Sequence, residues 1–480
     1  MTEQIIDKLN TLYNKWCGAD IEEYEELPKS GSARRYFRLK SSKGSAMGVY
    51  NTDKKENEAF LSFSKSLKNA GVNVPQIYGE DLIYNVYLQE DLGNQTLYSL
   101  LQDIKKQHNT FNDELINTYR KVLDSLATLQ IEGSKYIDFN KCYPRAAFDS
   151  QSMTWDLSYF KYYFLKLAHI DFDEQLLEND YNKLISILLE APCDFFLYRD
   201  FQSRNIMIRD GEPWFIDYQG GRKGALQYDV ASLLYDAKAD IPQDIRNSLL
   251  EYYIETLHKL CPDSNISNNF KQYFNSYVLI RIMQAMGAYG YRGFFERKSH
   301  FLKSIPFALD NLHYLLENTP SLYNMPELHR VLTLLCNNDE LRSIGNTSRL
   351  NVTVTSFSYK HAIPTDNSGN GGGFVFDCRA LPNPGRYPQY KTLTGKDNEV
   401  IAFFADVEDV MNNFLNACKT LVSISVERYI ERGFTSLTIN FGCTGGQHRS
   451  VFCAETLAKW LNENYDVDVF IKHWEQPQLN

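Results

Sequence analysis

The hydrophobic pattern of the chain changes character near residue 350, and this change limits the possible folds. Before it, residues 24–92 read as short strands around one helix, and residues 97–316 have mainly helical periodicity. After it, apolar runs alternate with helical segments: runs at 350–357, 374–377, 437–441 and 467–471, and helices at 407–432 and 448–464. Alternation of this kind predicts a small α/β domain with a mostly parallel sheet. A chain of 480 residues also exceeds what one hydrophobic core usually supports, so two unlike domains are expected.

We predict an α+β bilobal domain over residues 1–318, helical connecting material over 319–349 and the α/β domain over 350–480. In the first domain, strand-like runs at 36–39, 46–50 and 84–88 form a small lobe, and the later helices form a large lobe. This division predicts a cleft between the lobes. The first 17 residues carry apolar side chains at helical spacing, which indicates an amphipathic helix rather than a signal peptide.

Composition excludes several classes of function. The net charge of -10 argues against general affinity for nucleic acids or membrane surfaces, because both attract basic proteins. No run of about 18 apolar residues is present to span a bilayer. The nine cysteines form no C-x-x-C pair, which argues against a disulfide framework or a zinc site. A reducing, cytoplasmic location fits these features best.

Two motifs carry the chemistry of the first domain, YRDFQSRN at 198–205 and WFIDYQ at 214–219. Phosphoryl transfer to a hydroxyl needs a carboxylate to accept the proton and hard oxygen ligands for Mg²⁺. We therefore predict Asp200 as the base, with Asn205 and Asp217 as magnesium ligands. The alternative is two turns that contain Asp and Asn by chance. The spacing, and the strand before each motif, favour the catalytic interpretation.

These motifs resemble the catalytic loop H-x-D-x-x-x-x-N and the metal motif of aminoglycoside phosphotransferase-like kinases, which are relatives of protein kinases. The resemblance implies a protein-kinase-like fold with ATP and Mg²⁺ as cofactors. Tyr198 stands where that family usually has histidine. Asp229 matches the acidic residue that braces the catalytic loop in the family.

The nucleotide-binding residues implied by this resemblance are less regular. The segment SGSARRY at 30–36 lies where a phosphate-covering loop is expected, and its small residues allow close backbone approach. The strand at 46–50 lacks the lysine that usually pairs with the phosphates, so we predict that Arg34 or Arg35 substitutes for it. Of Glu56 and Glu58, we predict Glu58 as the acid of the following helix. The full set of predicted nucleotide-binding residues is Ser30, Gly31, Ser32, Arg34, Arg35, Glu58, Glu90 and Leu92, the last two lying between the lobes.

Three combinations, G-S-x-R-R-Y-x-R-L, E-D-L-G and Y-R-D-F-x-S-R-N-x-M, resemble the anomeric N-acetylmuramate/N-acetylglucosamine kinases over residues 24–316. This branch implies phosphorylation of the anomeric hydroxyl of an N-acetylated amino sugar in cell-wall recycling. A sugar-1-phosphate nucleotidyltransferase would then act downstream. We predict acceptor contacts from Asp156, Tyr159, Tyr289 and Arg292, for each of which core packing or a solvated helix face is the alternative. An aminoglycoside or choline as acceptor, and GTP in place of ATP, stay open.

The last strong motif is GCTGGQHRS at 442–450, which follows an apolar strand and begins a helix. Backbone N–H groups and the helix dipole hold anions in such an arrangement. Together with segments at 356–364, 376–384 and 393–397, the motif resembles the C-terminal domain of the RNase adaptor protein RapZ. That resemblance implies binding of glucosamine-6-phosphate. The residues predicted to line its pocket are Asp377, Cys443, Thr444, Gly445, Gly446, His448 and Arg449.

Two alternatives remain beside a bifunctional kinase and amino-sugar-phosphate sensor. The first is a kinase-like fold that has lost catalysis with its strand lysine and acts as a regulatory adaptor. The second is a phosphatase, because residues 443–449 also fit the C-x5-R loop of cysteine phosphatases. The neighbouring motifs do not favour that class. The chain ends without a basic tail, which argues against RNA as a partner.

Overall fold

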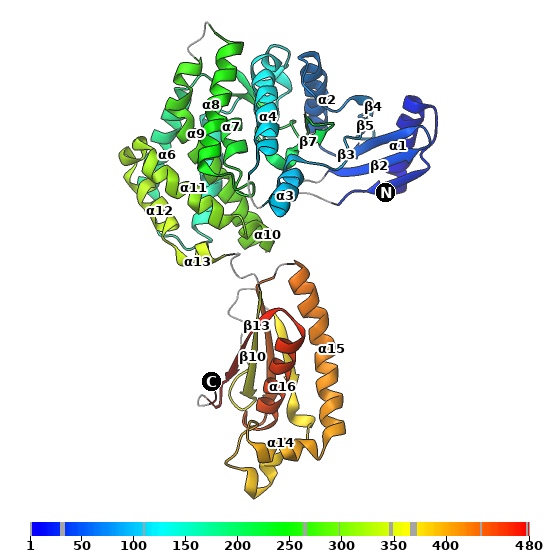
Figure 1. Ribbon diagram of the computed structural model, residues 1–480, viewed down its shortest axis with the longest axis vertical. Coiled ribbons are helices and arrows are strands. Elements are labelled where there is room, and N and C mark those ends of the chain that lie inside the picture. Colours follow the sequence, from blue (N-terminus) through cyan, green and yellow to red (C-terminus); the bar gives the residue numbers. More distant parts are fainter. Residues whose placement is uncertain are drawn as a thin grey trace. The chain divides into compact units, whose positions relative to one another are not determined.

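The computed structural model describes residues 2–28, 34–108, 111–262, 266–296, 298–344, 349–364, 372–432, 434–476 and 479. The chain forms two compact units (Figure 1). The first comprises Met1–Tyr291 and Ser304–Asn338, and the second comprises Arg292–Lys303 and Asp339–Asn480. No helix among the described residues is long and apolar enough to cross a membrane.

The first unit begins with a five-stranded antiparallel sheet in the order β1-β2-β3-β5-β4. Its strands are β1 (Glu23–Glu26), β2 (Arg35–Ser41), β3 (Gly44–Tyr50), β4 (Ile77–Asp81) and β5 (Val86–Glu90). Helix α1 (Thr2–Cys17) places Leu9 and Tyr13 against Phe37 and Leu39 on one face of this sheet. Helix α2 (Lys54–Asn69), capped by Asp53, meets the other face, because successive side chains of a strand alternate between faces.

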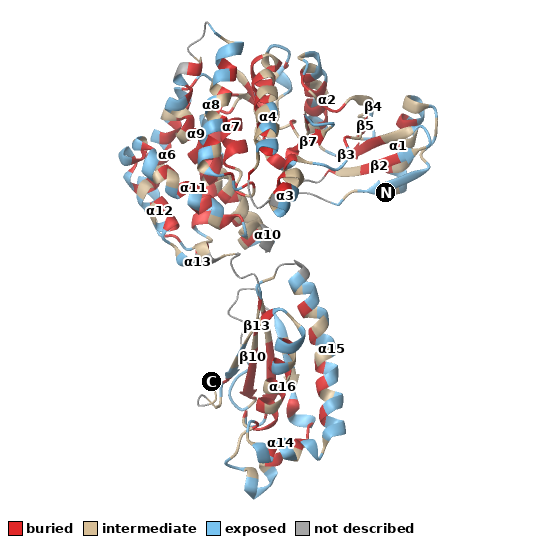
Figure 2. Cartoon of the chain, viewed as in Figure 1, coloured by how far each residue is buried: buried red, intermediate tan, exposed pale blue. Residues whose placement is uncertain are grey.

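The rest of the first unit is mainly helical. Its longer helices are α3 (Leu97–His108), α4 (Asp113–Ile131), α5 (Ser150–Phe160), α6 (Glu174–Leu189), α7 (Gln227–Leu234), α8 (Gln243–Leu260), α9 (Ile266–Tyr289), α11 (Ile305–Asn318) and α12 (Pro326–Cys336). Their apolar stripes face inward, as the buried residues in Figure 2 show. Two short strand pairs interrupt the helices: β6 (Phe195–Leu197) with β9 (Arg222–Gly224), and β7 (Ile206–Arg209) with β8 (Glu212–Phe215). The motif at 198–205 therefore connects β6 to β7, and Asp217 follows β8.

The second unit is built on a four-stranded sheet in the order β11-β12-β10-β13. Its strands are β10 (Leu350–Ser358), β11 (Gly373–Asp377), β12 (Ser436–Cys443) and β13 (Val467–His473), and the described pairs are parallel. The main helices are α14 (Asn398–Ala405), α15 (Glu408–Arg432) and α16 (Arg449–Asn464); the shorter α10 (Ser299–Leu302) and α13 (Asp339–Ser343) also belong to this unit. The predicted fold class is confirmed: a bilobal α+β kinase-like part and a small parallel α/β part.

Candidate active site and anion site

The predicted catalytic loop is braced by a buried carboxylate. Asp229, on α7, accepts hydrogen bonds from the backbone N–H groups of Tyr198 (2.7 Å) and Arg199 (3.0 Å). Arg199 has a φ of 86°, a strained conformation for a residue with a side chain, so these bonds fix the turn that presents Asp200. Burial raises the pKa of Asp229 to about 7, although the hydrogen bonds that it accepts oppose the shift.

A second set of contacts joins the catalytic loop to Asp217. The Tyr198 hydroxyl donates to the carbonyl of Ile216, and the Ile216 N–H donates to the carbonyl of Asn205 (3.2 Å). The side-chain amide of Asn205 donates to the carbonyl of Asp200 (2.9 Å). Tyr198 is fully buried, so the tyrosine that replaces the usual histidine joins the two loops through a buried hydrogen bond. The three predicted catalytic and metal-binding residues are thus brought to one place.

Arg34 lies opposite these loops. Its guanidinium contacts Asp217 (Nη1 to Oδ1, 3.2 Å) and Glu56 of α2 (Nη2 to Oε2, 2.9 Å), and its side chain is only 3% exposed. Burial raises the pKa of Asp217, while the charge of Arg34 opposes that shift. A cation therefore stands between the helix acid and the predicted metal ligand, where a strand lysine was expected.

Two of the predicted nucleotide-binding residues are corrected by this geometry. Glu58 was the wrong choice of helix acid: it points to solvent and pairs with Lys141 at 3.4 Å. Arg35 does not accompany Arg34 either, because it begins β2 with the opposite orientation and pairs with Glu26 at 2.8 Å. Residues Ser30, Gly31 and Ser32 lie outside the described residues.

The segment between the lobes is held by ion pairs. Asp91 accepts from Arg38 (2.9 Å) and from the Ser45 hydroxyl (2.6 Å), and Arg38 also donates to the carbonyl of Gly93 (3.0 Å). The Glu90 side chain is paired with Arg209 at 2.5 Å, so any contact of Glu90 with a nucleotide falls to its backbone. Leu92 is buried. Sequence reasoning missed Arg38 and Arg209, although Arg38 is part of the quoted R-R-Y-x-R-L motif.

The predicted acceptor residues do not form one group. Both carboxylate oxygens of Asp156 accept from Arg199 (2.8 and 2.5 Å), which makes Asp156 a structural partner of the catalytic loop rather than a substrate ligand. Arg292 pairs with Glu296 at 2.9 Å and is grouped with the second unit, and its contact with an acceptor stays a prediction. Tyr159 packs against Tyr163, with ring centroids 5.1 Å apart. Tyr289 lines a small cavity in the described part of the first unit.

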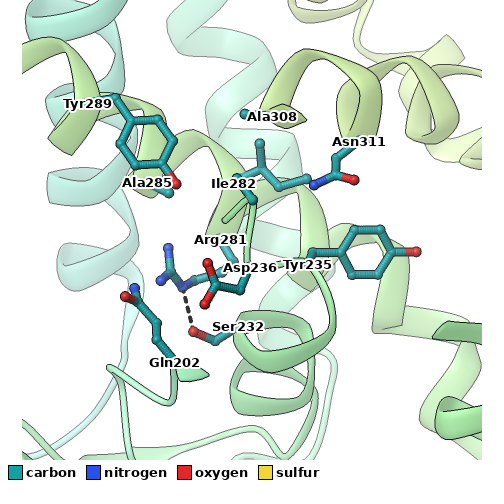
Figure 3. A pocket seen from close by; sticks show the side chains of 11 residues that line it. Gln202, Ser232, Tyr235, Asp236, Arg281, Ile282, Ala285, Tyr289, Ala308 and Asn311 are labelled. Carbon is teal, nitrogen blue, oxygen red and sulfur yellow. Dashed lines mark hydrogen bonds between the residues drawn. The ribbon is translucent and has the colours of Figure 1, made fainter. Parts of the chain in front are cut away.

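That cavity lies behind the catalytic loop and holds about 20 Å³, room for about one water molecule. In Figure 3, Tyr289 and Arg281, both on α9, and Asp236, in the turn that follows α7, surround this cavity. Asp236 accepts from the hydroxyl of Ser203 in the catalytic loop (2.7 Å), and Arg281 donates to Ser232 (2.9 Å). The remaining lining residues are Gln202, Tyr235, Ala237, Ile282, Ala285, Ala308 and Asn311. Arg281 and Asp236 were missed, because no local motif marks a charge on a buried helix face or in the turn after a helix.

The second unit holds a larger cavity, about 240 Å³, at the loop between β12 and α16. Five of the predicted residues line it: Cys443, Thr444, Gly445, His448 and Arg449. They are joined by Lys360, Asn383, Gly385, Lys391 and Gln447. Gly446 takes a left-handed φ of 62°, and a side chain there would collide with Glu475, which explains the glycine. Asp377 lies outside the cavity lining and pairs with Arg379 at 2.6 Å, which lowers the pKa of Asp377.

Two side chains that line the cavity, Arg449 and His448, are held in place by contacts with backbone carbonyl groups. Arg449 donates through Nη1 to the carbonyls of Arg379 (2.9 Å) and Leu381 (3.2 Å). Among the described residues, no partner contacts the buried Nε of Arg449. The Nε2 atom of His448 lies 2.8 Å from the carbonyl of Tyr390. A cavity lined by two lysines, an arginine and a histidine at a helix N-terminus suits an anion.

The bilobal fold and the loops that bring Asp200, Asn205 and Asp217 together have the arrangement expected of a phosphotransferase. Comparison with known families agrees. Residues 23–263 match the Phosphotransferase enzyme family, and the chain belongs to that family. Residues 350–476 match the RapZ C-terminal domain.

Individual relatives share parts of the chain. A nucleotide-binding protein of Acidobacterium capsulatum is 39% identical over 134 residues, 28% of this chain and 41% of that protein. One from Thermosipho melanesiensis is 29% identical over 247 residues, 51% of this chain and 81% of that protein. The matched part of the chain therefore spans about two fifths of the length of the Acidobacterium protein and 81% of the length of the Thermosipho protein.

Among solved structures, a choline kinase from Cryptosporidium parvum Iowa II aligns with a TM-score of 0.48 and 14% identity, over 69% of this chain and all of that one. The ADP-bound aminoglycoside phosphotransferase APH(2'')-Ib aligns with a TM-score of 0.44 and 13% identity, over 70% of this chain and 99% of that one.

Proposed function

We propose that the first unit is an ATP- and Mg²⁺-dependent kinase that phosphorylates a hydroxyl group of a small molecule. The observation that carries the proposal is the bracing of Asp200, Asn205 and Asp217 by Asp229 and Tyr198 through buried hydrogen bonds. Such preorganisation is what positions groups around a transferring phosphoryl group.

In this proposal, Asp200 accepts the proton of the acceptor hydroxyl as the phosphoryl group is transferred. Asn205 and Asp217 would hold Mg²⁺, and the donor set fits, since both offer the hard oxygens that this ion prefers. Asn205 already uses its amide N–H toward the carbonyl of Asp200, so its Oδ1 is the atom that would hold the metal. Magnesium, when bound, neutralises charge on the phosphate oxygens. Arg34 takes the role of the missing lysine, linking the helix acid Glu56 to the phosphates.

The acceptor in this proposal is the anomeric hydroxyl of an N-acetylated amino sugar, N-acetylmuramate or N-acetylglucosamine. The motifs of that branch support it. A sugar-1-phosphate nucleotidyltransferase is the partner expected to consume the product.

An ATP-consumption screen tests this function. Purified full-length protein is assayed with N-acetylmuramate, N-acetylglucosamine, other hexoses, choline and kanamycin, and Asp200→Asn serves as the control. Turnover confined to an amino sugar and abolished in the control supports the proposal. MgATP binding without turnover of any acceptor would instead favour the alternative, a catalytically impaired adaptor.

We also propose that the second unit binds an amino-sugar phosphate such as glucosamine-6-phosphate. The observation that supports this part is the 240 Å³ cavity, whose described lining includes Lys360, Lys391 and Arg449 and no carboxylate. Titration calorimetry with glucosamine-6-phosphate, compared with inorganic phosphate and glucosamine, measures which part of the ligand is recognised. If the ligand regulates the kinase, its addition should change kcat/KM by about fivefold or more. Identical rates with and without it would remove the regulatory role.

A further inference from the structure

The loop that forms the anion cavity also surrounds a cysteine. Cys443 is the last residue of β12 and lines the cavity, and its Sγ lies 3.2 Å from the hydroxyl of Ser450 in the first turn of α16. The guanidinium of Arg449, whose Nε is buried without a partner among the described residues, lines the same space. A thiol, an anion-binding loop and a buried cation are thus brought together by one strand–loop–helix connection.

The surroundings of Cys443 favour its thiolate. Burial raises the pKa of the thiol, but the hydroxyl of Ser450, the backbone N–H groups of Ser450 and Gly445 and the charge of Arg449 together lower it below its ordinary value. Another cysteine of the same core behaves oppositely: burial raises the pKa of Cys418 to about 12. A thiolate rather than a thiol is the nucleophilic form of cysteine.

We propose that Cys443 is a nucleophile that takes the phosphoryl group from a phosphate monoester bound in this cavity, which gives the second unit a hydrolytic activity. The inference rests on the anion-binding role proposed above. It extends that role, because the bound ligand becomes a substrate rather than a signal only.

The reaction balances with the groups present and water. The Cys443 thiolate attacks phosphorus, so that an S–P bond forms and the P–O bond to the alcohol breaks. His448 lines the cavity and its Nε2 faces the carbonyl of Tyr390, so a protonated His448 has Nδ1–H to donate to the leaving oxygen. Neutral His448 then takes a proton from water, which attacks the cysteinyl phosphate and releases inorganic phosphate and the thiolate. Arg449 and the loop N–H groups hold the phosphate oxygens throughout.

The test uses the full chain with Asp200→Asn in every protein, so that kinase turnover does not interfere. Release of inorganic phosphate from p-nitrophenyl phosphate and from glucosamine-6-phosphate is measured for this background, for Cys443→Ser and for Cys193→Ser, an exposed matched control. We expect activity in the background and in Cys193→Ser, and none in Cys443→Ser. His448→Asn should slow release about 100-fold, and Ser450→Ala roughly 10-fold. Acid-quenched background protein should carry one phosphoryl group on the peptide that contains Cys443.

Binding separates the two ways in which this inference can fail. Calorimetry with glucosamine-6-phosphate is run on the same proteins. Normal binding together with phosphate release no faster than in Cys443→Ser would overturn the nucleophile and leave a pure binding site. Absence of both binding and release would overturn the nucleophile and the proposed ligand class together.

Discussion

Arg34 offers the sharpest test of the kinase, because it occupies the place of a lysine that the chain lacks. Replacing it by methionine keeps most of its length but removes the cation between Glu56 and Asp217. We expect Arg34→Met to fold and to bind MgATP weakly, with a large loss of turnover. Arg34→Lys should retain part of the activity, since it keeps the charge but not the fork that reaches two partners.

The expected magnitude follows from the surroundings of Arg34. Its side chain is 3% exposed, so the group acts where water screens little, and removal of one such donor to a transferring phosphoryl group lowers kcat by about 100- to 1,000-fold. The cost in stability is smaller. Glu56 is 36% exposed and regains water, whereas the more desolvated Asp217 loses the charge that stabilises it, so we expect a loss of about 1–2 kcal/mol. Arg34→Lys should lose about tenfold in kcat/KM.

The assay is steady-state ADP production with the acceptor found in the screen, alongside thermal unfolding of each variant. Arg35→Met is the matched control, because the neighbouring arginine pairs with Glu26 on the other side of the strand. Its kcat/KM should stay within about twofold of the parent. The reasoning is refuted if folded Arg34→Met keeps parental kcat/KM, or if Arg35→Met loses as much activity as Arg34→Met.

Three further predictions concern single residues. Tyr198→Phe removes the hydroxyl that holds the carbonyl of Ile216, so the free energy of unfolding should fall by about 1–3 kcal/mol in denaturant titrations, and an unchanged value would deny the bracing role. The pKa of Asp229 in the folded state is about 7, above its ordinary value of 3.8. Its contribution to stability is therefore present below about pH 4 and is lost as the pH rises through 7. In thermal unfolding, Asp229→Asn should lack this decrease of stability with pH. Arg449→Met should weaken glucosamine-6-phosphate binding about 10- to 100-fold by calorimetry, and unaltered affinity would place the ligand elsewhere.

The site residues that lie close together in the sequence and carry the reactive groups could be predicted. Asp200 and Asn205 share one loop, and Asp217 follows the next strand, so their spacing alone indicates that they meet. The choice between Glu56 and Glu58 was not of this kind. Side chains that are two positions apart on a helix point in nearly opposite directions. Which of the two glutamates faces the site therefore depends on how α2 is rotated against the sheet. That rotation is set by packing, for example Phe60 against Tyr87, and not by the local sequence.

Long-range pairing explains the other errors. Asp156 carries the features of a substrate ligand, an acid beside aromatic residues, until Arg199 is placed against it from 43 residues away. Arg281 lies in α9, whose apolar and polar residues are not separated onto two faces. Only the fold shows that it shares a cavity with Gln202 of the catalytic loop. In both cases a buried charge is defined by its partner. A partner that is distant in sequence leaves no local signal.

The replacement of the strand lysine shows how geometry substitutes for position in the chain. Strands β2 and β3 are antiparallel, and Arg35 lies opposite Tyr50, so the residue just before β2 stands beside the end of β3. A cation at position 34 therefore enters the site from the same end of the sheet as a cation late in β3, and it meets Glu56 in the first turn of α2. What the chemistry requires is a positive charge between that glutamate and the phosphates. Because the start of β2 or the end of β3 can supply this charge, the absence of the lysine does not by itself indicate a loss of catalytic activity. A basic residue before β2, together with an acid in the first turn of α2, is the pattern that predicts retained activity.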